Sequence, residues 1–267
     1  MKTRVISAII MIPLLATVYI GGYVLAAACF AVGLLGTREF YRSFKTADVT
    51  PSTAVALVSA VMLYGLNYLA SGWDEAYIAH SYTFWFTITI FLSFLYMFKI
   101  EKRGVYDGMA TLTGILYVCF FSFHVVLTDQ LNVHSNLIWL IFITAFGTDI
   151  MAYFTGMLIG RHKLCPSISP KKTVEGAVGG LLGSMFFCGL FGWFVAPEVF
   201  IHCIIIGALG GIFSQLGDLT ASIFKRKLGI KDFGNLIPGH GGVLDRFDSL
   251  LFTAPVVHYY IIFIIVR

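Results

Sequence analysis

One stretch of the chain, residues 222–248, concentrates the residue types that bind anions and metal ions. Only 12% of the 267 residues are charged, yet these 27 residues hold eight of the 32 charged residues. Cations come first, a centre rich in glycine and proline follows, and carboxylates come last. This order suits an anionic ligand that is held together with a divalent metal ion. The charged residues are Lys225, Arg226, Lys227, Lys231, Asp232, Asp245, Arg246 and Asp248.

Asp218 and Asp245 are the predicted metal ligands, and Asp248 is the next candidate. Asp218, Ser222 and Lys225 follow one another at spacings of four and three, which places them on one face of a helix. If Asp218 lies at the edge of the hydrocarbon core of a membrane, its ionised carboxylate costs roughly a few kcal/mol of free energy unless it is paired or binds a metal. Magnesium usually takes one or two carboxylates together with phosphate oxygens and water. A salt bridge between Asp218 and a lysine at a helix end is the simpler alternative.

Two further segments carry polar residues that could meet a phosphate ligand. Asp149 lies inside an apolar run, where an aspartate is a candidate functional residue, although a hydrogen-bonded brace between helices explains it nearly as well. The loop that follows reads SISPKKTVEG, in which Lys171 and Lys172 stand beside a Ser-Pro turn. Adjacent lysines are also typical of cytoplasmic loops, so a phosphate site and a topological role are equally open. Residues 173–175 are predicted to cap the next helix.

The histidines and cysteines give no comparable pattern. His240 precedes two glycines and could either hydrogen-bond a phosphate or hold the turn. The other six histidines show no ligand spacing. The five cysteines are scattered and form no CxxC pair, which predicts neither a disulfide framework nor a zinc site.

The composition predicts the elements that must position these residues. With 58% hydrophobic residues and a mean hydropathy of +0.86, the chain is expected to be an all-α polytopic membrane protein. We predict about five helices in an N-terminal region, residues 1–135, and the remainder in a C-terminal region, residues 136–267, that carries the motifs. Gly21 and Gly22 are predicted to form a tight turn between the first two spans. The nine predicted spans are residues 5–20, 23–40, 52–70, 82–98, 108–127, 136–159, 174–196, 199–217 and 249–266.

Basic residues indicate the orientation of these spans. If the N-terminus lies in the cytoplasm, 17 of the 18 lysines and arginines fall on the cytoplasmic side. Because cytoplasmic loops carry the excess of Lys and Arg, this distribution supports both nine spans and the orientation. We therefore expect a multi-pass protein of the cell membrane whose reactive loops face the cytoplasm.

The motifs resemble the signature of the CDP-diacylglycerol synthases, also called phosphatidate cytidylyltransferases. Segments 149–156 (DIMAYFTG) and 169–176 (SPKKTVEG) are also similar to the family, with Ile150 where relatives often carry Thr or Ser. The N-terminal half agrees only in being hydrophobic. The signature positions are filled by Ser222, Lys225, Arg226, Lys231, Asp232, Gly234, Pro238, His240, Gly241, Gly242, Asp245, Arg246 and Asp248.

This resemblance implies a membrane homodimer that transfers a cytidylyl group from CTP to phosphatidic acid, giving CDP-diacylglycerol and pyrophosphate for phospholipid biosynthesis. It implies a requirement for magnesium, leaves a second cation open, and implies membrane lipids but no nucleic acid as partners. The catalytic set it implies is Asp218, Asp245, Lys225, Arg226 and Asp248, of which the first two would hold the metal. The substrate-binding set is Ser169, Lys171, Lys172, Thr173, Ser222, Lys231, His240, Arg246 and Asp149.

Two other classes of protein are alternatives to this enzyme. In a transporter, the intramembrane Asp149 and Asp218 would bind an ion or substrate, but the polar residues cluster in one half and no inverted repeat is visible. A lipid kinase or a CDP-alcohol phosphotransferase is the other alternative, and the spaced aspartate pattern of the latter enzymes is not found.

Overall fold

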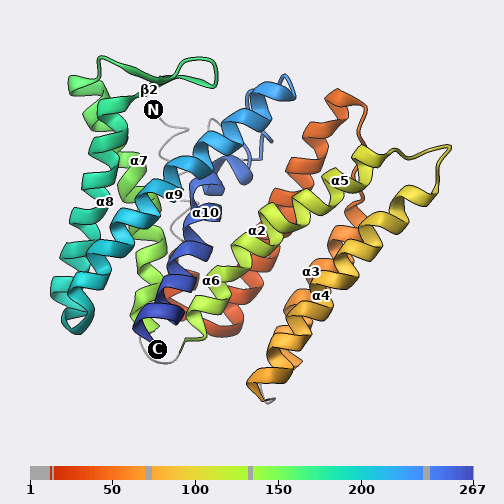
Figure 1. Ribbon diagram of the computed structural model, residues 1–267, viewed down its shortest axis with the longest axis horizontal. Helices are drawn as coiled ribbons and strands as arrows, with labels where there is room; N and C mark the ends of the chain where they lie inside the picture. Colours follow the sequence, from red (N-terminus) through yellow and green to blue (C-terminus); the bar gives the residue numbers. More distant parts are fainter. Residues whose placement is uncertain (1–12, 14, 70–73, 132–134, 237–240, 267) are drawn as a thin grey trace.

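The computed structural model describes residues 13, 15–69, 74–131, 135–236 and 241–266. Besides a helical stretch at residues 15–20, these residues form nine α-helices and one β-hairpin (Figure 1). The helices are α2 (Gly22–Ser43), α3 (Thr53–Leu69), α4 (Glu75–Leu95), α5 (Val105–Gly114), α6 (Phe121–Asp129), α7 (Trp139–Ile159), α8 (Val174–Val195), α9 (Phe200–Lys227) and α10 (Leu244–Tyr260). The strands are β1 (Lys163–Cys165) and β2 (Ser169–Thr173), which pair antiparallel. Short 3₁₀ or π segments are η1 (Phe44–Ala47), η3 (Tyr96–Phe98), η4 (Ile115–Phe120), η5 (Ser135–Ile138), η6 (Pro197–Val199) and η7 (Ile261–Ile265).

The predicted all-helical membrane architecture is confirmed. Seven helical segments of the described chain are long and apolar enough to cross a membrane, and α3 is a shorter apolar helix. The eight predicted spans from residue 23 onward each coincide with a helical segment. Most of the first predicted span, 5–20, lies outside the described residues, and its residues 15–20 are helical.

The largest difference from the predicted boundaries is at the end of α9. The predicted apolar span ends at residue 217, and the helix continues beyond it to Lys227, because polar helix-forming residues replace apolar ones without a helix breaker. It ends just before Gly229, whose φ of +66° belongs to the left-handed region that favours glycine. The extra turns place Asp218 inside a helix, ahead of the basic residues of the last turn.

The turn before α2 has the predicted form. Gly21 and Gly22 have φ angles of +68° and +56°, which other residues rarely adopt. The amide of Gly22 donates a 2.7 Å hydrogen bond to Oδ2 of Asp129 at the end of α6. The turn is therefore fixed to the end of the bundle opposite Arg42, which lies in the last turn of α2.

Helices α7, α8 and α9 pack closely beside the hairpin (Figure 1). A Cβ atom added to Gly176 would lie 2.8 Å from the carbonyl oxygen of Ala152, and one added to Gly180 would lie 2.9 Å from that of Thr148. Only glycine permits this approach between α7 and α8. The close packing brings the polar residues of α7 next to the start of α8.

An aromatic cluster joins the two halves of the chain. Phe40 of α2 packs edge-on against Phe224 of α9, with ring centroids 5.0 Å apart, and its ring lies 6.0 Å from that of Phe233. Such contacts bury apolar area and fix the relative position of the rings. The loop before α10 is thereby docked on α2, so the predicted N-terminal and C-terminal regions share a core.

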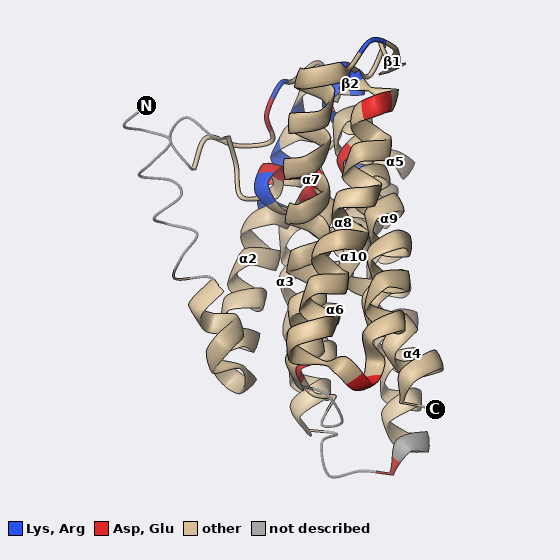
Figure 2. Ribbon diagram, turned by 90° about the vertical axis from the view of Figure 1, so that its left-hand side faces the viewer, with Lys and Arg blue, Asp and Glu red and all other residues tan. Residues whose placement is uncertain are grey.

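Charged side chains are unevenly distributed along the bundle. Figure 2 shows the lysines and arginines gathered at the end that carries the β1–β2 hairpin. The opposite end of the described chain shows only acidic residues among its charged groups in this view. The predicted site residues are therefore expected at the basic end of the bundle.

Candidate active site

A cavity of about 360 Å³ with charged residues in its wall opens between α7, β2, α8 and α9. Its charged lining residues are Asp149 of α7, Lys171 and Lys172 of β2, and Asp218 of α9. Gln215, one turn before Asp218, also lines it and donates to the carbonyl of Ala177, which fixes its amide. The structure thus brings together three segments that the sequence analysis selected separately.

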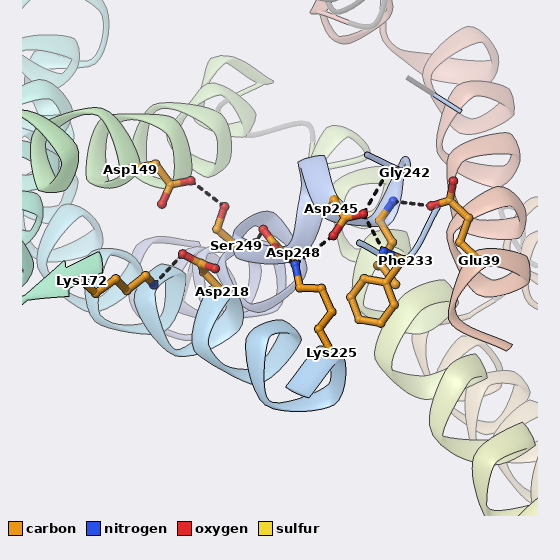
Figure 3. A network of polar contacts seen from close by, with 11 residues as sticks. Glu39, Asp149, Lys172, Asp218, Lys225, Phe233, Gly242, Asp245, Asp248 and Ser249 are labelled. Atoms are coloured by element: carbon orange, nitrogen blue, oxygen red, sulfur yellow. Dashed lines mark hydrogen bonds and ion pairs between the residues drawn. The ribbon is translucent and has the colours of Figure 1, made fainter. Parts of the chain in front are cut away.

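Lys172 and Asp218 form an ion pair across this cavity. The Nζ of Lys172 lies 2.5 Å from Oδ2 of Asp218, and both side chains remain more than a quarter exposed (Figure 3). An exposed pair of this kind adds little stability, because water screens the charges. Asp218 is therefore paired with a lysine of the hairpin and not with one at the end of its own helix. Both charges stay accessible to a ligand.

Asp218 also lies near two further carboxylates, those of Asp149 and Asp248. The hydroxyl of Ser249 donates a 3.1 Å hydrogen bond to Oδ2 of Asp149, and its amide donates to Oδ1 of Asp248 at 2.9 Å. Asp149, Asp218 and Asp248 lie close enough to interact electrostatically (Figure 3). Like charges held together in a poorly hydrated region attract a cation, which lowers their mutual repulsion.

Asp245 has a different surrounding. Its Oδ1 lies 2.8 Å from Nζ of Lys225, and its Oδ2 accepts hydrogen bonds from the amides of Phe233 at 2.8 Å and Gly242 at 3.0 Å. Its side chain is only 2% exposed. These contacts hold the loop before α10, and Asp248 lies between Asp245 and Asp218 in Figure 3. The pairing of Asp218 with Asp245 as metal ligands stays a prediction, while Asp149 and Asp248 are carboxylates that interact electrostatically with Asp218.

Lys225 connects these two parts of the site. Besides Asp245, its Nζ lies 3.9 Å from Oδ2 of Asp248, and it lies over the ring of Phe233 at 5.3 Å from the centroid. Its side chain is 13% exposed. One buried ammonium thus balances two aspartates of the first turns of α10. This arrangement gives Lys225 a structural role in addition to the predicted catalytic one.

Arg226 holds the lysine hairpin. Its Nε donates a 3.1 Å hydrogen bond to the carbonyl oxygen of Ile168, in the turn between β1 and β2. The hairpin register pairs Lys163 with Thr173 and Cys165 with Ser169. Arg226 therefore fixes the strand that carries Lys171 and Lys172, and its predicted catalytic role would be exerted through their position.

The remaining predicted substrate-binding residues differ in whether they line the cavity. Thr173 lines the cavity and caps α8 by accepting a 3.1 Å hydrogen bond from the amide of Gly176, as predicted. Ser169 lies in β2, Ser222 is half-buried on α9 and Lys231 is exposed after it. His240 lies outside the described residues, so its role stays a prediction.

Arg246 carries a donor that is suited to an anion. Its Nε is buried and has no hydrogen-bond partner within the described chain, and its charge interacts with that of Asp149. A buried donor without a partner loses about 1–3 kcal/mol relative to a bonded one, which a phosphate oxygen would restore. This observation favours a role of Arg246 in substrate binding.

Glu39 is a residue that the sequence analysis missed. Its carboxylate is buried and accepts hydrogen bonds from the amides of Val243 at 3.0 Å and Leu244 at 2.9 Å (Figure 3). It thereby caps the N-terminus of α10 from α2, where the helix dipole favours a negative charge. Cβ atoms on Gly234 or Gly242 would collide with it. The available signal was an acidic residue within the otherwise basic segment TREFYR.

Replacing Glu39 by alanine is expected to lower the free energy of unfolding by about 1–3 kcal/mol, because two buried amides lose their acceptor. The exposed Glu101 in the loop before α5 provides a matched control as Glu101→Ala. Thermal unfolding of the detergent-solubilised variants measures the effect. Equal melting temperatures for the two variants would show that Glu39 does not hold α10.

The described residues contain no group of three or more His, Cys, Asp or Glu side chains arranged to hold a metal ion. Magnesium usually needs only one or two protein carboxylates, since phosphate oxygens and water complete its coordination. The oxygen donors of Asp149, Asp218 and Asp248 are of the type this ion prefers. They fit an ion that enters together with a phosphate ligand.

Comparison with known proteins gives a consistent result. A family model described as the cytidylyltransferase family matches residues 2–264. A phosphatidate cytidylyltransferase of Synechocystis sp. is 34% identical over 292 residues, covering 98% of this chain and 97% of the relative. The protein of that name from Staphylococcus haemolyticus is 32% identical, covering 97% and 98%. The one from Bacillus subtilis is 35% identical over 173 residues, covering 64% of each.

Proposed function

The chain belongs to the cytidylyltransferase family, and we propose that it transfers the cytidylyl group of CTP to phosphatidic acid in the cavity between α7, β2, α8 and α9. The observation that carries this proposal is the meeting of Lys172 and Asp218 across that cavity. One segment supplies cations for phosphates and the other supplies carboxylates for a metal ion. A site that has both can bind a nucleotide triphosphate beside an anionic lipid.

Asp218, with Asp149 or Asp248, would hold a magnesium ion. When bound, such an ion neutralises negative charge on phosphate oxygens and on the leaving group. The carboxylates would orient the triphosphate on one side of the cavity. Asp245 remains a predicted ligand, although its present contacts with Lys225 and two amides would have to be shared or broken.

The reaction joins a lipid phosphate to the nucleotide. An oxygen of the phosphatidate phosphate attacks the α-phosphorus of CTP, a new P–O–P linkage forms, and the bond to the β-phosphate breaks to release pyrophosphate. The second pKa of a phosphate monoester is about 6, so the attacking group is largely a dianion at neutral pH. A protein base is therefore not required. Positioning and electrostatic stabilisation remain the work of the protein.

The cations of the site would bring two mutually repelling anions together. Lys172 is held by Asp218 in the structure, and a phosphate would replace that carboxylate as its partner. Lys171 lines the same cavity, and the unpartnered Nε of Arg246 can donate to a phosphate oxygen. These charge-assisted contacts are stronger than neutral hydrogen bonds, so they can align both substrates.

A direct assay tests the proposed function. The purified protein is incubated with α-³²P-labelled CTP, phosphatidic acid and magnesium, and label is sought in the lipid phase. We expect labelled CDP-diacylglycerol and an equal amount of pyrophosphate. Absence of label from the lipid, with CTP intact, would contradict the proposal. Release of inorganic phosphate without labelled lipid would instead indicate hydrolysis.

Replacing Lys171 by alanine is expected to lower kcat/KM about tenfold, because a charge-assisted contact to phosphate is worth roughly 1.5–3 kcal/mol. Lys102→Ala is the matched control, since Lys102 is an exposed cation in the loop before α5. The rate of pyrophosphate release measures both. Equal effects of the two changes would leave Lys171 with only a topological role.

The orientation and the assembly extend this proposal. The basic end of the bundle would face the cytoplasm of the cell, because Lys and Arg accumulate on that side of membrane proteins. CTP and magnesium would then enter from the cytoplasm, while phosphatidic acid and other membrane lipids would approach from the bilayer. The resemblance to CDP-diacylglycerol synthases also supports a homodimer, which cross-linking in intact membranes can test.

A further inference from the structure

We propose that Arg38 and Arg42 form a second phosphate-binding site, on the side of the α10 loop away from the Asp218 cavity. The two arginines lie one helical turn apart near the end of α2, so their side chains share a face. Together with residues 233–236 they line a cavity of about 450 Å³. This cavity shares no lining residue with the cavity around Asp218. It is therefore a separate place for a ligand.

A second cavity, next to the first, is also lined by cationic side chains. Its volume is about 360 Å³, and it is lined by both arginines together with Lys45, Tyr41 and Thr50. Arg38, Arg42 and Lys45 are all exposed. Three cations thus face two neighbouring hollows at the basic end of the bundle, where an anion can be approached from more than one side.

Within the part of the chain that the structure describes, no acidic group pairs with these arginines. Neither guanidinium takes part in an ion pair or a hydrogen bond within the described residues. The nearest acid in the sequence is Glu39, which lies between them, but its carboxylate is directed to the amides of Val243 and Leu244. The helix N-terminus therefore takes up the charge that would otherwise neutralise the arginines. An anion from outside the chain can take that place.

The type of cation indicates the class of anion. Guanidinium groups donate two parallel hydrogen bonds to a phosphate, which makes arginine pairs suited to phosphate recognition. The position at the polar end of a membrane bundle admits two sources of this group, the headgroup of an anionic phospholipid and the phosphates of a soluble nucleotide. Both present the same oxygens to Arg38 and Arg42.

An anion bound at this site can affect the position of the loop before α10. Phe233 forms part of the cavity wall, and its amide donates to Oδ2 of Asp245. Glu39, in the same turn of α2 as the arginines, caps α10 just before Asp245. An anion that draws α2 and residues 233–236 together would therefore tighten the loop that leads to Asp245 at the start of α10. The site lies outside the proposed reaction cavity, so it does not depend on the proposed function.

Equilibrium binding to the full-length, detergent-solubilised chain tests this site. Calorimetric titrations use short-chain phosphatidylglycerol or ATP as separate probes, because neither is a substrate of the proposed transfer. We expect the double variant Arg38→Gln with Arg42→Gln to weaken binding of at least one probe about tenfold. Weakened binding of phosphatidylglycerol identifies a headgroup site, and weakened binding of ATP alone identifies a nucleotide phosphate site.

The control variant removes an equal number of positive charges from the same end of the bundle. The double variant Lys99→Gln with Lys102→Gln changes two exposed lysines in the loop between η3 and α5. Unchanged binding of every probe by the arginine variant would overturn the proposal, and so would equal weakening by both variants, because that indicates a general effect of charge. Binding is measured without turnover, so failure here is distinct from failure of the transfer assay.

Discussion

Replacing Asp218 by asparagine is expected to lower kcat about 100-fold, which is the size of effect seen when one electrostatic contact to a transition state is removed. Asparagine has the same shape but lacks the negative charge that pairs with Lys172. We expect the variant to fold, because both side chains of this pair are more than a quarter exposed and contribute little stability. The initial rate of pyrophosphate release with saturating CTP and phosphatidic acid measures the loss.

The control for this prediction is an aspartate at the other end of the bundle. Asp129→Asn retains an oxygen that can accept from the amide of Gly22, and it lies away from the basic end. Its activity should remain close to that of the unmodified protein. If Asp218→Asn also retained near-normal activity, Asp218 would have no role in holding a metal ion or in balancing Lys172.

The largest effect on stability is expected from Lys225. Replacing it by methionine, which keeps much of the side-chain volume, leaves Asp245 and Asp248 without their shared counter-charge. Removal of one partner from a buried pair typically costs about 3–5 kcal/mol, because the remaining charge is uncompensated. A fall in the midpoint of thermal unfolding, monitored by circular dichroism in detergent, measures the destabilisation.

A second substitution separates this explanation from loss of packing. Asp245→Asn in the Lys225→Met background removes the uncompensated charge and should recover a large part of the lost stability. The two single variants and the double variant form a cycle that isolates the interaction. If the double variant were as unstable as the sum of the single changes, the pair of Lys225 and Asp245 would not account for the effect.

The sequence could predict the elements of this fold because each depends on local properties. Runs of apolar residues locate the spans, and the paired glycines at residues 21–22 locate a turn whose positive φ angles are observed. The predicted apolar span is shorter than α9 because hydrophobicity marks where the membrane ends, whereas the helix continues to Lys227, just before Gly229. Helical propensity and membrane depth are separate properties, and only the second was used to set that boundary.

The contacts within the site could be predicted only in part. Segments 149–156 and 169–176 and the residues around Asp218 were selected separately, and the structure brings them to one cavity. Their partners depend on how distant helices pack, which spacing along one helix does not reveal. The burial of Asp245 against Lys225 and the capping of α10 by Glu39, more than 200 residues earlier in the chain, are contacts of that kind.

The central claim is that the carboxylates around Asp218 receive a metal ion together with the phosphates of CTP. The most direct measurement is the position of Mn²⁺, used in place of magnesium, in anomalous difference density from crystals grown with a CTP analogue that resists cleavage. We expect the ion to lie about 2.1 Å from a carboxylate oxygen of Asp218, in contact with the triphosphate. An ion and nucleotide bound elsewhere, with Asp218 still paired only with Lys172, would contradict the claim.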